Sequence, residues 1–448
     1  VRKKIISFNS KINFSKAPQH LNILPGQFND VLNQSIPYDE INQNALVQNF
    51  NTDNSIGFVQ KIGKIVNEIK TGIGYTYKNL QTGINKINNG TIFNMPDSFT
   101  NQFGWNNLRL YAESNTILKM GKKQLEILLP IELNAISTTD KLRNKNTRKS
   151  YLFFNPLLDF SYILSRNFDI GTLYYIQSGT GSFLQLAQGY ILKDYRDITR
   201  NDSLLPLSTM QTLSLSLDYK NPVNSMFGYF SLSFNQTKNN IIYNQQYNNY
   251  FINSIALQLP NFQKSFSLSG NISKYFIEQK MNVSLNGGAN FYNIDLLQQN
   301  SFVKNISKSY NAGLKINYSK WTMVSLQSNT NFNAYINSVK GNQNTSPVLK
   351  SYKLNEQFKI DFSITKKADL YFNNEFYAVW DNNNLKKQYF FGDVGLTQKF
   401  KRTEFDLEWS NYTNNKTYTV INNFQNLRQV GTYKIRSSNI IAKFYFNF

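Results

Sequence analysis

The chain has 448 residues, and its 28 Tyr, 35 Phe and 4 Trp make it too aromatic for a disordered protein. It contains no cysteine and one histidine, His20, which excludes disulfides, a thiol nucleophile and the usual zinc and general-base sites; we expect no metal and no cofactor. Its 48 Lys and Arg exceed its 27 Asp and Glu, but no zinc-finger, RNP or KH pattern accompanies the charge, so we expect no nucleic-acid partner.

The N-terminal segment has a basic start but an apolar run too short for the core of a signal peptide. Its apolar residues share one parity instead, which is typical of a strand: Ile6, Phe8, Ile12 and Phe14. We expect a mature chain or, preferably, a fragment of a longer protein. The Pro-flanked stretch around His20 is expected to lie outside the strands.

Alternation of apolar and polar residues dominates the rest of the chain, and it places the two kinds of side chain on opposite faces of a sheet. No stretch reaches the ~18–20 apolar residues of a membrane-spanning helix. Only Gln43–Phe50 and Ile62–Ile69 leave helix and strand open. The clearest apolar series begin at Leu125, Leu158, Leu213, Phe230, Met281, Tyr310, Leu354, Leu370, Phe405 and Ile440.

Many of these runs extend for about ten residues or more, whereas strands of soluble sandwiches usually have ~5–6. Ten residues is the length that a tilted strand needs to cross a membrane, and a sheet in lipid must close because an open edge leaves backbone groups unsatisfied. An outward apolar band and a polar lumen also explain how many aromatic residues coexist with a mean hydropathy of −0.44. The sequence therefore predicts one all-β domain over residues 1–448, a transmembrane antiparallel up-and-down β-barrel of about 18–22 strands.

Short and long connections alternate, as they do in outer-membrane barrels, whose periplasmic turns are short. Short turns are predicted at residues 121–123, 165–167, 220–222, 319–320, 366–367 and 401–402. Long polar connections are predicted at about 137–149, 178–208, 294–308, 337–350, 381–388 and 413–429. The alternation fails near 238–248, which looks long where a turn is expected, and this indicates a merged or missed strand nearby.

The chain stops inside its final strand with three aromatic residues of one parity, Phe444, Phe446 and Phe448. This ending resembles the C-terminal signal by which the barrel-assembly machinery recognises its clients, although Lys443 replaces the usual small residue. An ordinary amphipathic strand at a domain edge is the alternative.

Residues Tyr195–Pro206 precede a clear strand pair, 209–219 and 226–236. This arrangement resembles the mid-barrel segment of Bacteroidota TonB-dependent receptors, where a D-x-x-x-I-x-x-G-N-x-x-L-x-P stretch leads into two long strands. Asn201-Asp202 replaces Gly-Asn here, and the spacing differs. Other segments similar to plug-bearing barrels of that phylum are Pro18, Pro25-Gly26, Gln43 and Asn271–Lys274.

The resemblance implies the barrel of an outer-membrane receptor or transporter in a Gram-negative bacterium, whose full form has about 22 strands. It implies uptake of a bulky nutrient such as an iron chelate, a vitamin, a glycan or a peptide, with energy relayed by TonB. The plug and the signal peptide are not recognisable and are expected upstream or absent. Implied partners are outer-membrane lipid and lipopolysaccharide, the barrel-assembly machinery, and TonB with a surface lipoprotein or other complex subunits.

Two other non-catalytic functions stay open: a structural scaffold barrel of an outer-membrane complex, and a passive porin. The Tyr-, Asn- and Arg-rich stretches Asn239–Tyr250 and Asp381–Tyr389 are candidates to contact a sugar or chelate, although loops are polar in any case. An enzyme is not expected. A hydrolase at the rim of a barrel needs a histidine with Ser or Asp partners, and the one histidine, His20, is expected outside the strands. The carboxylates Asp393 and Glu404 do not have a spacing that specifies acid/base catalysis.

Overall fold

The computed structural model describes residues 3–24, 32, 38–201, 205–247, 251–341, 347–382, 386–424 and 427–446. Within these ranges, no helix combines the length and the apolar character needed to cross a membrane.

The described residues form eighteen long strands that run up and down. This number counts β7 and β8 as one strand, because both pair with β6 and only Asn155 and Pro156 separate them. They are β1 (Lys3–Ile23), β2 (Glu40–Ile62), β3 (Ile65–Asn88), β5 (Thr100–Met120), β6 (Lys123–Asp140), β7 (Lys145–Phe154), β8 (Leu157–Ile163), β9 (Phe168–Thr180), β12 (Leu207–Asn221), β13 (Met226–Asn239), β16 (Asn261–Phe276), β17 (Met281–Gln298), β18 (Ser301–Trp321), β19 (Val324–Gly341), β20 (Leu349–Thr365), β21 (Ala368–Asp381), β22 (Lys386–Lys399), β23 (Thr403–Ser410) and β26 (Asn439–Phe446).

Shorter elements occupy the long connections between these strands. They are β4 (Thr91–Asn94), the 3-10 turn η1 (Asp97–Phe99), the 3-10 turn η2 (Phe183–Leu186), β10 (Ile191–Leu192), β11 (Asp197–Asn201), β14 (Ile242–Tyr247), β15 (Ile252–Leu257), β24 (Thr417–Phe424) and β25 (Leu427–Lys434).

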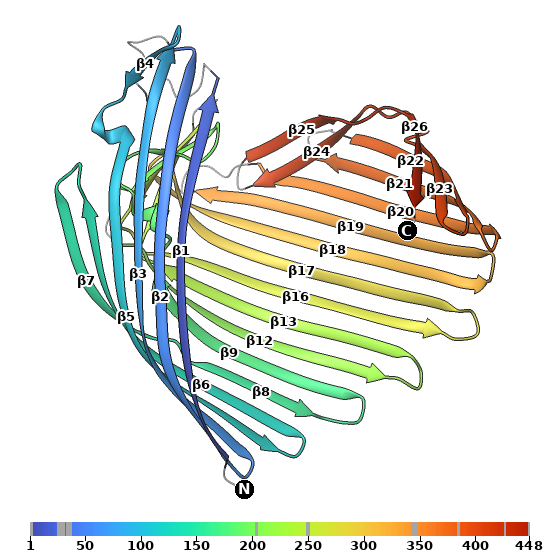
Figure 1. Ribbon diagram of the computed structural model, residues 1–448, viewed down its shortest axis with the longest axis horizontal. Helices are drawn as coiled ribbons and strands as arrows, with labels where there is room; N and C mark the ends of the chain where they lie inside the picture. The colour runs from blue at the N-terminus through green and yellow to red at the C-terminus, as the bar shows by residue number, and fades with distance from the viewer. Residues whose placement is uncertain are drawn as a thin grey trace.

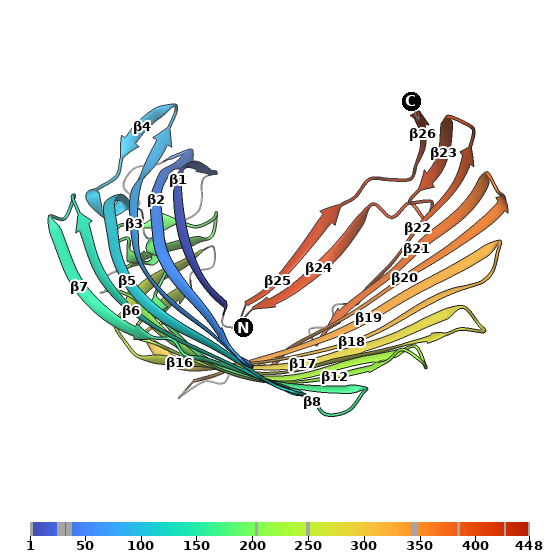
Figure 2. The same ribbon diagram turned by 60° about the horizontal axis from the view of Figure 1, so that its bottom comes forward.

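Each long strand pairs antiparallel with the next one in the series, so the fold is an all-β, up-and-down sheet, as the alternation predicts. The sheet is strongly curled, with β1 at one edge and β26 at the other (Figure 1, Figure 2). Among the described residues no pairing joins these two edges. The predicted strand pair 209–219 and 226–236 is confirmed as β12 and β13, joined in one continuous register.

The two faces of the sheet differ in the way that the alternation predicts. On β5, Leu108 and Leu110 point to the outer face and are more than 40% exposed, while Arg109 between them points to the concave face. The register places Leu110 opposite Leu133 of β6, so apolar residues continue across strands on the outer face. Across the sheet, this outer face carries large apolar side chains that are exposed.

Five of the six predicted short turns are confirmed within a residue or two, and the sixth lies later than predicted: residues 319–320 belong to β18, and the chain turns at 322–323. All of these turns lie at one end of the sheet. Two of the tightest turns begin with a glycine: Gly63 and Gly121 both have φ of +59°. Such a backbone conformation favours glycine, because it has no Cβ to clash with the following carbonyl. Local sequence therefore fixes these reversals.

Two connections predicted to be long are in fact tight. Residues 137–149 form a hairpin with a four-residue turn, and 294–308 form one whose two turn residues, Gln299 and Asn300, have φ of +50° and +63°. Positive φ at both central positions suits a two-residue hairpin. These strand ends resemble a loop in the sequence because polar and apolar residues occur on both parities there, as in the run Asp295, Leu296, Leu297, Gln298.

The failure near 238–248 has the expected cause, because β16 was missed. Its outer-face series contains Lys264, Gly270 and Lys274, which hide the alternation. With β16 in place, the stretch near 238–248 falls at the end of the sheet that carries the long connections, and the eight short turns fall at the other end. Gln43–Phe50 and Ile62–Ile69, left open between helix and strand, lie in β2 and β3 or at the turn between them.

Candidate functional site

The concave face of the sheet carries ion pairs and hydrogen bonds rather than an apolar core. Arg109 of β5 contacts Asp53 of β2 and lies 3.5 Å from the carboxylate of Glu132 of β6. The hydroxyl of Tyr111 donates to Asp53 over 2.9 Å. Buried or half-buried charges are tolerated where they are paired, so this face is polar but largely self-satisfied.

A glycine on β3 makes room for the Tyr111 side chain. A Cβ at Gly72 would lie 2.5 Å from the Tyr111 ring and hydroxyl and 2.7 Å from the carbonyl of Asn54. Any larger residue would therefore push the tyrosine off Asp53. The small residue in the strand is explained by close approach of a neighbour, not by a turn.

Residues 181–201, here called the inner segment, fold onto the concave face of β2, β3, β5 and β6. Their buried side chains complete two apolar clusters. In one cluster Leu192 and Ile198 pack with residues of the sheet and the loops: Ile23, Leu32, Ile41, Ile84, Phe99 and Phe251. In the other, Phe183, Leu186 and Ala187 pack with Leu80, Phe103, Trp105, Ile136 and Leu205. The long polar connection predicted at 178–208 therefore contains a packed element, residues 181–201, while residues 202–204 lie outside the described residues.

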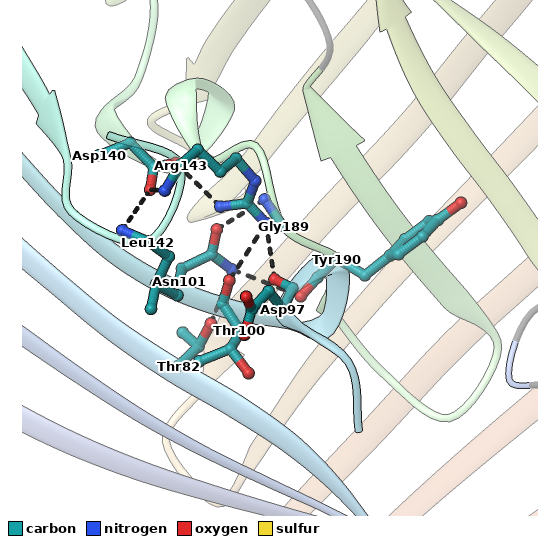
Figure 3. A network of polar contacts seen from close by, with 9 residues as sticks. All are labelled: Thr82, Asp97, Thr100, Asn101, Asp140, Leu142, Arg143, Gly189 and Tyr190. Carbon is teal, nitrogen blue, oxygen red and sulfur yellow. Dashed lines mark hydrogen bonds and ion pairs between the residues drawn. The ribbon is translucent and has the colours of Figure 1, made fainter. Parts of the chain in front are cut away.

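Two buried amide side chains of the sheet bind the backbone of the inner segment. The amide of Gln43 donates to the carbonyl of Leu192 and accepts from its N–H, both over 2.8 Å. The side chain of Asn101 accepts from the N–H of Gly189 over 2.7 Å and donates to the hydroxyl of Thr82 over 2.8 Å (Figure 3). Buried backbone groups need such partners, so these amides fix where the segment lies.

An arginine in the turn between β6 and β7 binds backbone groups close to Asn101. Arg143, in the turn between β6 and β7, pairs with Asp140 over 2.9 Å. Its other terminal nitrogen donates to the carbonyls of Asp97, over 2.8 Å, and Thr100, over 3.3 Å (Figure 3). The Asp140 carboxylate also accepts from the N–H groups of Leu142 and Arg143. The network joins the turn after β6 to η1 and to the first residue of β5.

The candidate stretch Asn239–Tyr250 forms part of a ribbon made by β10, β11, β14 and β15, with parallel pairings between β11 and β15 and between β14 and β17. Its residues 248–250 lie outside the described residues. The hydroxyl of Tyr247 donates to Gln245 over 2.7 Å and accepts from Gln298 over 3.1 Å. Burial raises the pKa of Tyr247 to about 12, so the phenol is a hydrogen-bond donor at neutral pH. This tyrosine supports the ribbon rather than facing a ligand.

The hairpin of β24 and β25, here called the C-terminal hairpin, covers another part of the concave face, over β19, β20 and β21. It is held at one side by an ion pair of 2.6 Å between Arg428 and the buried carboxylate of Asp381. At another point Tyr389 donates to the hydroxyl of Thr419 over 2.8 Å. Both ends of the candidate stretch Asp381–Tyr389 thus hold the hairpin, and residues 383–385 lie outside the described residues.

Beneath the C-terminal hairpin lies a hollow of about 400 Å³ lined by tyrosines, amides and one lysine. Tyr335, Tyr352 and Tyr377 line it together with Lys353, whose ammonium lies 5.0 Å from the centre of the Tyr377 ring. Val420 of the hairpin closes one side. Aromatic faces beside hydrogen-bonding groups suit a solute with both ring-like surface and polar edges.

A second hollow of about 420 Å³ lies on the concave face nearer the turn end of the same strands. Lys315, Lys359, Glu375 and Asp393 line it with several amide side chains. Asp393 accepts from the hydroxyl of Ser410 over 3.0 Å and from the N–H of Asn411 over 2.7 Å. This carboxylate therefore has a structural role, and Glu404 lies near the end of the sheet in register with Lys399.

The expectation for His20 is wrong in one respect, because His20 lies within β1 and not outside the strands. Pro18, which also lies in β1, is compatible with an edge strand, where one row of N–H groups has no ladder partner. Its ring nitrogens contact the side chains of Asn44, at 2.7 Å, and Asn42, at 3.0 Å. Within the described ranges no three His, Cys, Asp or Glu side chains come together as a metal site.

The C-terminal aromatic residues that resemble an assembly signal lie on the outer face of β26. Phe444 and Phe446 are both more than 60% exposed, and the Phe444 ring lies 4.8 Å from that of Phe405. Phe448 lies outside the described residues. Their role in assembly stays a prediction.

Sequence reasoning missed the residues that fix the inner segment and those under the C-terminal hairpin. Gln43 and Asn101 look like any polar residue of a strand, because their partners lie 149 and 88 residues away in the chain. The apolar residues of the inner segment, Phe183, Leu186 and Ile198, were the available signal: a purely solvated loop has little use for them.

Comparison with known proteins gives remote structural likenesses only. A scan of protein-family models found no match, and a search of curated proteins found no relative. Among solved structures, the open form of the ferric-catecholate import receptor Fiu from E. coli K12 is 9% identical over 99% of this chain and 81% of its own, with a TM-score of 0.32. OccAB1 of Acinetobacter baumannii is 9% identical over 88% and 97%, with a TM-score of 0.27. The ferric enterobactin receptor PfeA in complex with BCV-L6 is 10% identical over 90% and 76%, with a TM-score of 0.25. At these values the comparisons assign no function to the chain.

Proposed function

We propose that this chain forms the membrane-spanning wall of an outer-membrane transporter that takes up a bulky polar nutrient. The observation that carries the proposal is the division of side chains between the two faces of one sheet. Large apolar residues such as Leu110, Leu215 and Leu285 are exposed on the outer face, while charges and amides line the concave face. In water the outer face would be unfavourable, whereas lipid would bury it at ~25 cal/mol per Å².

A spanning sheet must close, and the strand count supports closure. Because eighteen strands alternate in direction, β1 and β26 run antiparallel to each other and can share one ladder. Both carry an apolar outer face, with Ile6 and Phe8 on β1 and Ile440 and Phe444 on β26. We therefore propose that these edges pair in the membrane.

Engineered cysteines test that pairing cleanly, since the chain has none of its own. Ala442→Cys is combined in turn with Ile6→Cys, Phe8→Cys and Ser10→Cys, which share the outer face. We expect one combination to form a disulfide in the outer-membrane fraction, seen as a mobility shift lost on reduction. No crosslink in any combination, in protein that is otherwise heat-modifiable, would contradict closure by these two strands.

The side chains of the concave face indicate which kind of solute the transporter would take up. The hollow under the C-terminal hairpin offers Tyr335, Tyr352, Tyr377 and Lys353, which can stack on and hydrogen-bond to a glycan or an aromatic chelate. As the sequence resemblance implies, we propose that TonB supplies the energy, with a plug or other subunits contributed from outside the described residues. The proposal is of a transport protein rather than an enzyme.

A passive channel is the second candidate, favoured by the firm packing of the inner segment. Because Leu186 and Ile198 are buried and Gln43 fixes the backbone of Leu192, the segment narrows the concave side permanently, as a constriction would. We expect the two functions to differ in conductance. A transporter barrel needs a ligand and an energised cell, whereas a passive channel conducts steadily by itself.

Two measurements test the proposal. Outer-membrane fractions are run on gels before and after boiling, and we expect a shift, since a closed barrel resists detergent until heated; identical mobility would contradict the barrel. The purified chain is then placed in a planar bilayer. Steady conductance without a ligand would replace the transporter with the passive channel.

A further inference from the structure

The turn end of the sheet is strongly basic. The eight short connections, here called the turn rim, contain eight Lys or Arg residues against a single acidic residue, Glu278. The basic residues are Lys64, Lys122, Arg166, Lys280, Lys366, Lys367, Lys401 and Arg402. All of them are exposed. The excess positive charge of the chain is thus concentrated partly on one edge.

Apolar side chains are exposed at the same edge. Val223, Ile277, Trp321, Met323 and Phe400 are each more than half exposed at or beside the turns. A soluble acidic partner would match the charges but would gain nothing from these residues. A surface that is both apolar and anionic matches both, and a phospholipid leaflet is such a surface.

One part of the outer face has the shape to hold a lipid chain. Three glycines on neighbouring strands, Gly228, Gly270 and Gly287, leave an open hollow of about 720 Å³, here called the glycine groove. The register places Gly270 directly opposite Gly287. Phe230, Ile272 and Leu285 form the walls, and the lining is predominantly apolar.

A lysine stands where the glycine groove meets the turn rim. Lys274 of β16 is in register with Met226, a groove residue on β13. Its ammonium lies 5.1 Å from the centre of the Phe276 ring, at the outer face. The same arrangement recurs at the rim, where the ammonium of Lys123 lies 5.4 Å from the centre of the Tyr162 ring. Within the described part of the chain, no ion pair joins Lys274 to an acidic residue.

From these contacts we propose that the glycine groove and Lys274 form a binding site for an anionic phospholipid. The acyl chain lies over the glycines, and the phosphate lies at Lys274, with Lys280 of the same hairpin close to the headgroup. Long basic side chains at a membrane boundary extend toward the headgroups while their stems cover apolar surface. The inference rests on the proposed function, because it needs the outer face to be in lipid.

The test uses the full chain, purified in mild detergent and stripped of lipid. It is incubated with phosphatidylglycerol or with phosphatidylethanolamine of the same acyl chains, and native mass spectrometry measures the lipid retained. We expect about a fivefold preference for phosphatidylglycerol in the unaltered chain. Lys274→Gln should abolish the preference. Lys264→Gln, on the same strand and face but at the opposite end, should leave it unchanged.

A second variant tests the groove itself. Gly287→Leu places a side chain in the hollow, and its Cβ meets only the carbonyl of Asn311 at 3.5 Å, which is ordinary contact. We expect retention of both lipids to fall by about fivefold, since the apolar part of the site is filled. Unchanged retention in Gly287→Leu would remove the groove from the site.

The outcomes separate the two proposals. Heat modifiability is recorded for each protein first. If the unaltered chain migrates identically before and after boiling, the proposal of a membrane barrel is overturned. A heat-modifiable chain that retains both lipids equally, or that loses the preference equally in Lys264→Gln and Lys274→Gln, would overturn only the lipid site.

Discussion

Two elements fold onto the concave face of this sheet, and different contacts hold them there. The inner segment of residues 181–201 shares two apolar clusters with β2, β3, β5 and β6 and is bound by buried amides. The C-terminal hairpin lies above a hollow of about 400 Å³ and is held by the Arg428–Asp381 pair and the Tyr389–Thr419 hydrogen bond. Dense apolar burial makes the first a fixed part of the wall, while sparse polar contacts make the second the easier one to open.

This difference bears on transport. In the proposed transporter, we expect a solute to reach the hollow under the C-terminal hairpin more easily when the hairpin opens, and we expect the inner segment to limit the width of the concave side.

Removing an apolar anchor of the inner segment should have the largest effect. Leu186 is 6% exposed, whereas Leu184 in the same 3-10 turn is 53% exposed. Leu186→Ala should destabilise the docked segment by about 3 kcal/mol, and Leu184→Ala should do little. Hydrogen exchange of the amide of Asn201, which donates to the carbonyl of Ala187, reports the opening. Equal effects from the two variants would show that the cluster does not hold the segment.

Removing the amide of Gln43 should have the next largest effect. Gln43→Met keeps the length of the side chain but leaves the buried N–H and C=O of Leu192 without this partner, at a cost of about 2 kcal/mol. Gln48→Met on the other face of β2, where the side chain has one partner in Asn79, is the control. Hydrogen exchange at residue 192 measures both variants. No acceleration in Gln43→Met would mean that the apolar clusters alone position the segment.

Weakening the attachment of the C-terminal hairpin should cost less free energy than either change in the inner segment. Arg428→Ala removes an ion-pair partner of the buried Asp381 carboxylate, and because Arg428 is partly exposed we expect a loss of about 1 kcal/mol. A cysteine introduced at Val420, which lines the hollow, is then the only cysteine of the chain and should react faster with a thiol reagent. Lys434→Ala, an exposed change on β25, is the control. If the cysteine reacts no faster in Arg428→Ala than without this change, the hairpin is held as firmly as the inner segment.

The smallest effect is expected from a change of pH on the stability of the ribbon formed by β10, β11, β14 and β15. Burial raises the pKa of Asp197, which Lys193 partly offsets. The folded ribbon therefore holds this proton more tightly than the unfolded chain, so its stability falls as pH rises from the ordinary value of 3.8 through the raised pKa and is level above it. Hydrogen exchange of the ribbon at acid and neutral pH measures the slope, and Asp197→Asn should remove it. A slope that survives in Asp197→Asn would assign it to another group.

The sequence predicts the sheet well because its signals are local. Alternation in series such as Leu125–Leu133, with a glycine at Gly63 and Gly121, is enough to define the strands and several turns. It fails where local signals fade: the polar ends of β17 and β18 resemble loop, and the lysines and Gly270 of β16 interrupt its apolar series. The C-terminal residues Phe444 and Phe446 are correctly placed on the outer face of a last strand, and their assembly role awaits a test.

By itself the sequence determined the class of fold, the direction of the strands and the division between an apolar and a polar face, since each depends on residues two positions apart. Only the tertiary structure decided which connections turn inward. The partners of Gln43, Asn101 and Arg428 lie 149, 88 and 47 residues away, and nothing in their own neighbourhood distinguishes them from solvated side chains. The outer-face groove formed by Gly270 and Gly287 likewise exists only because the register sets these glycines side by side.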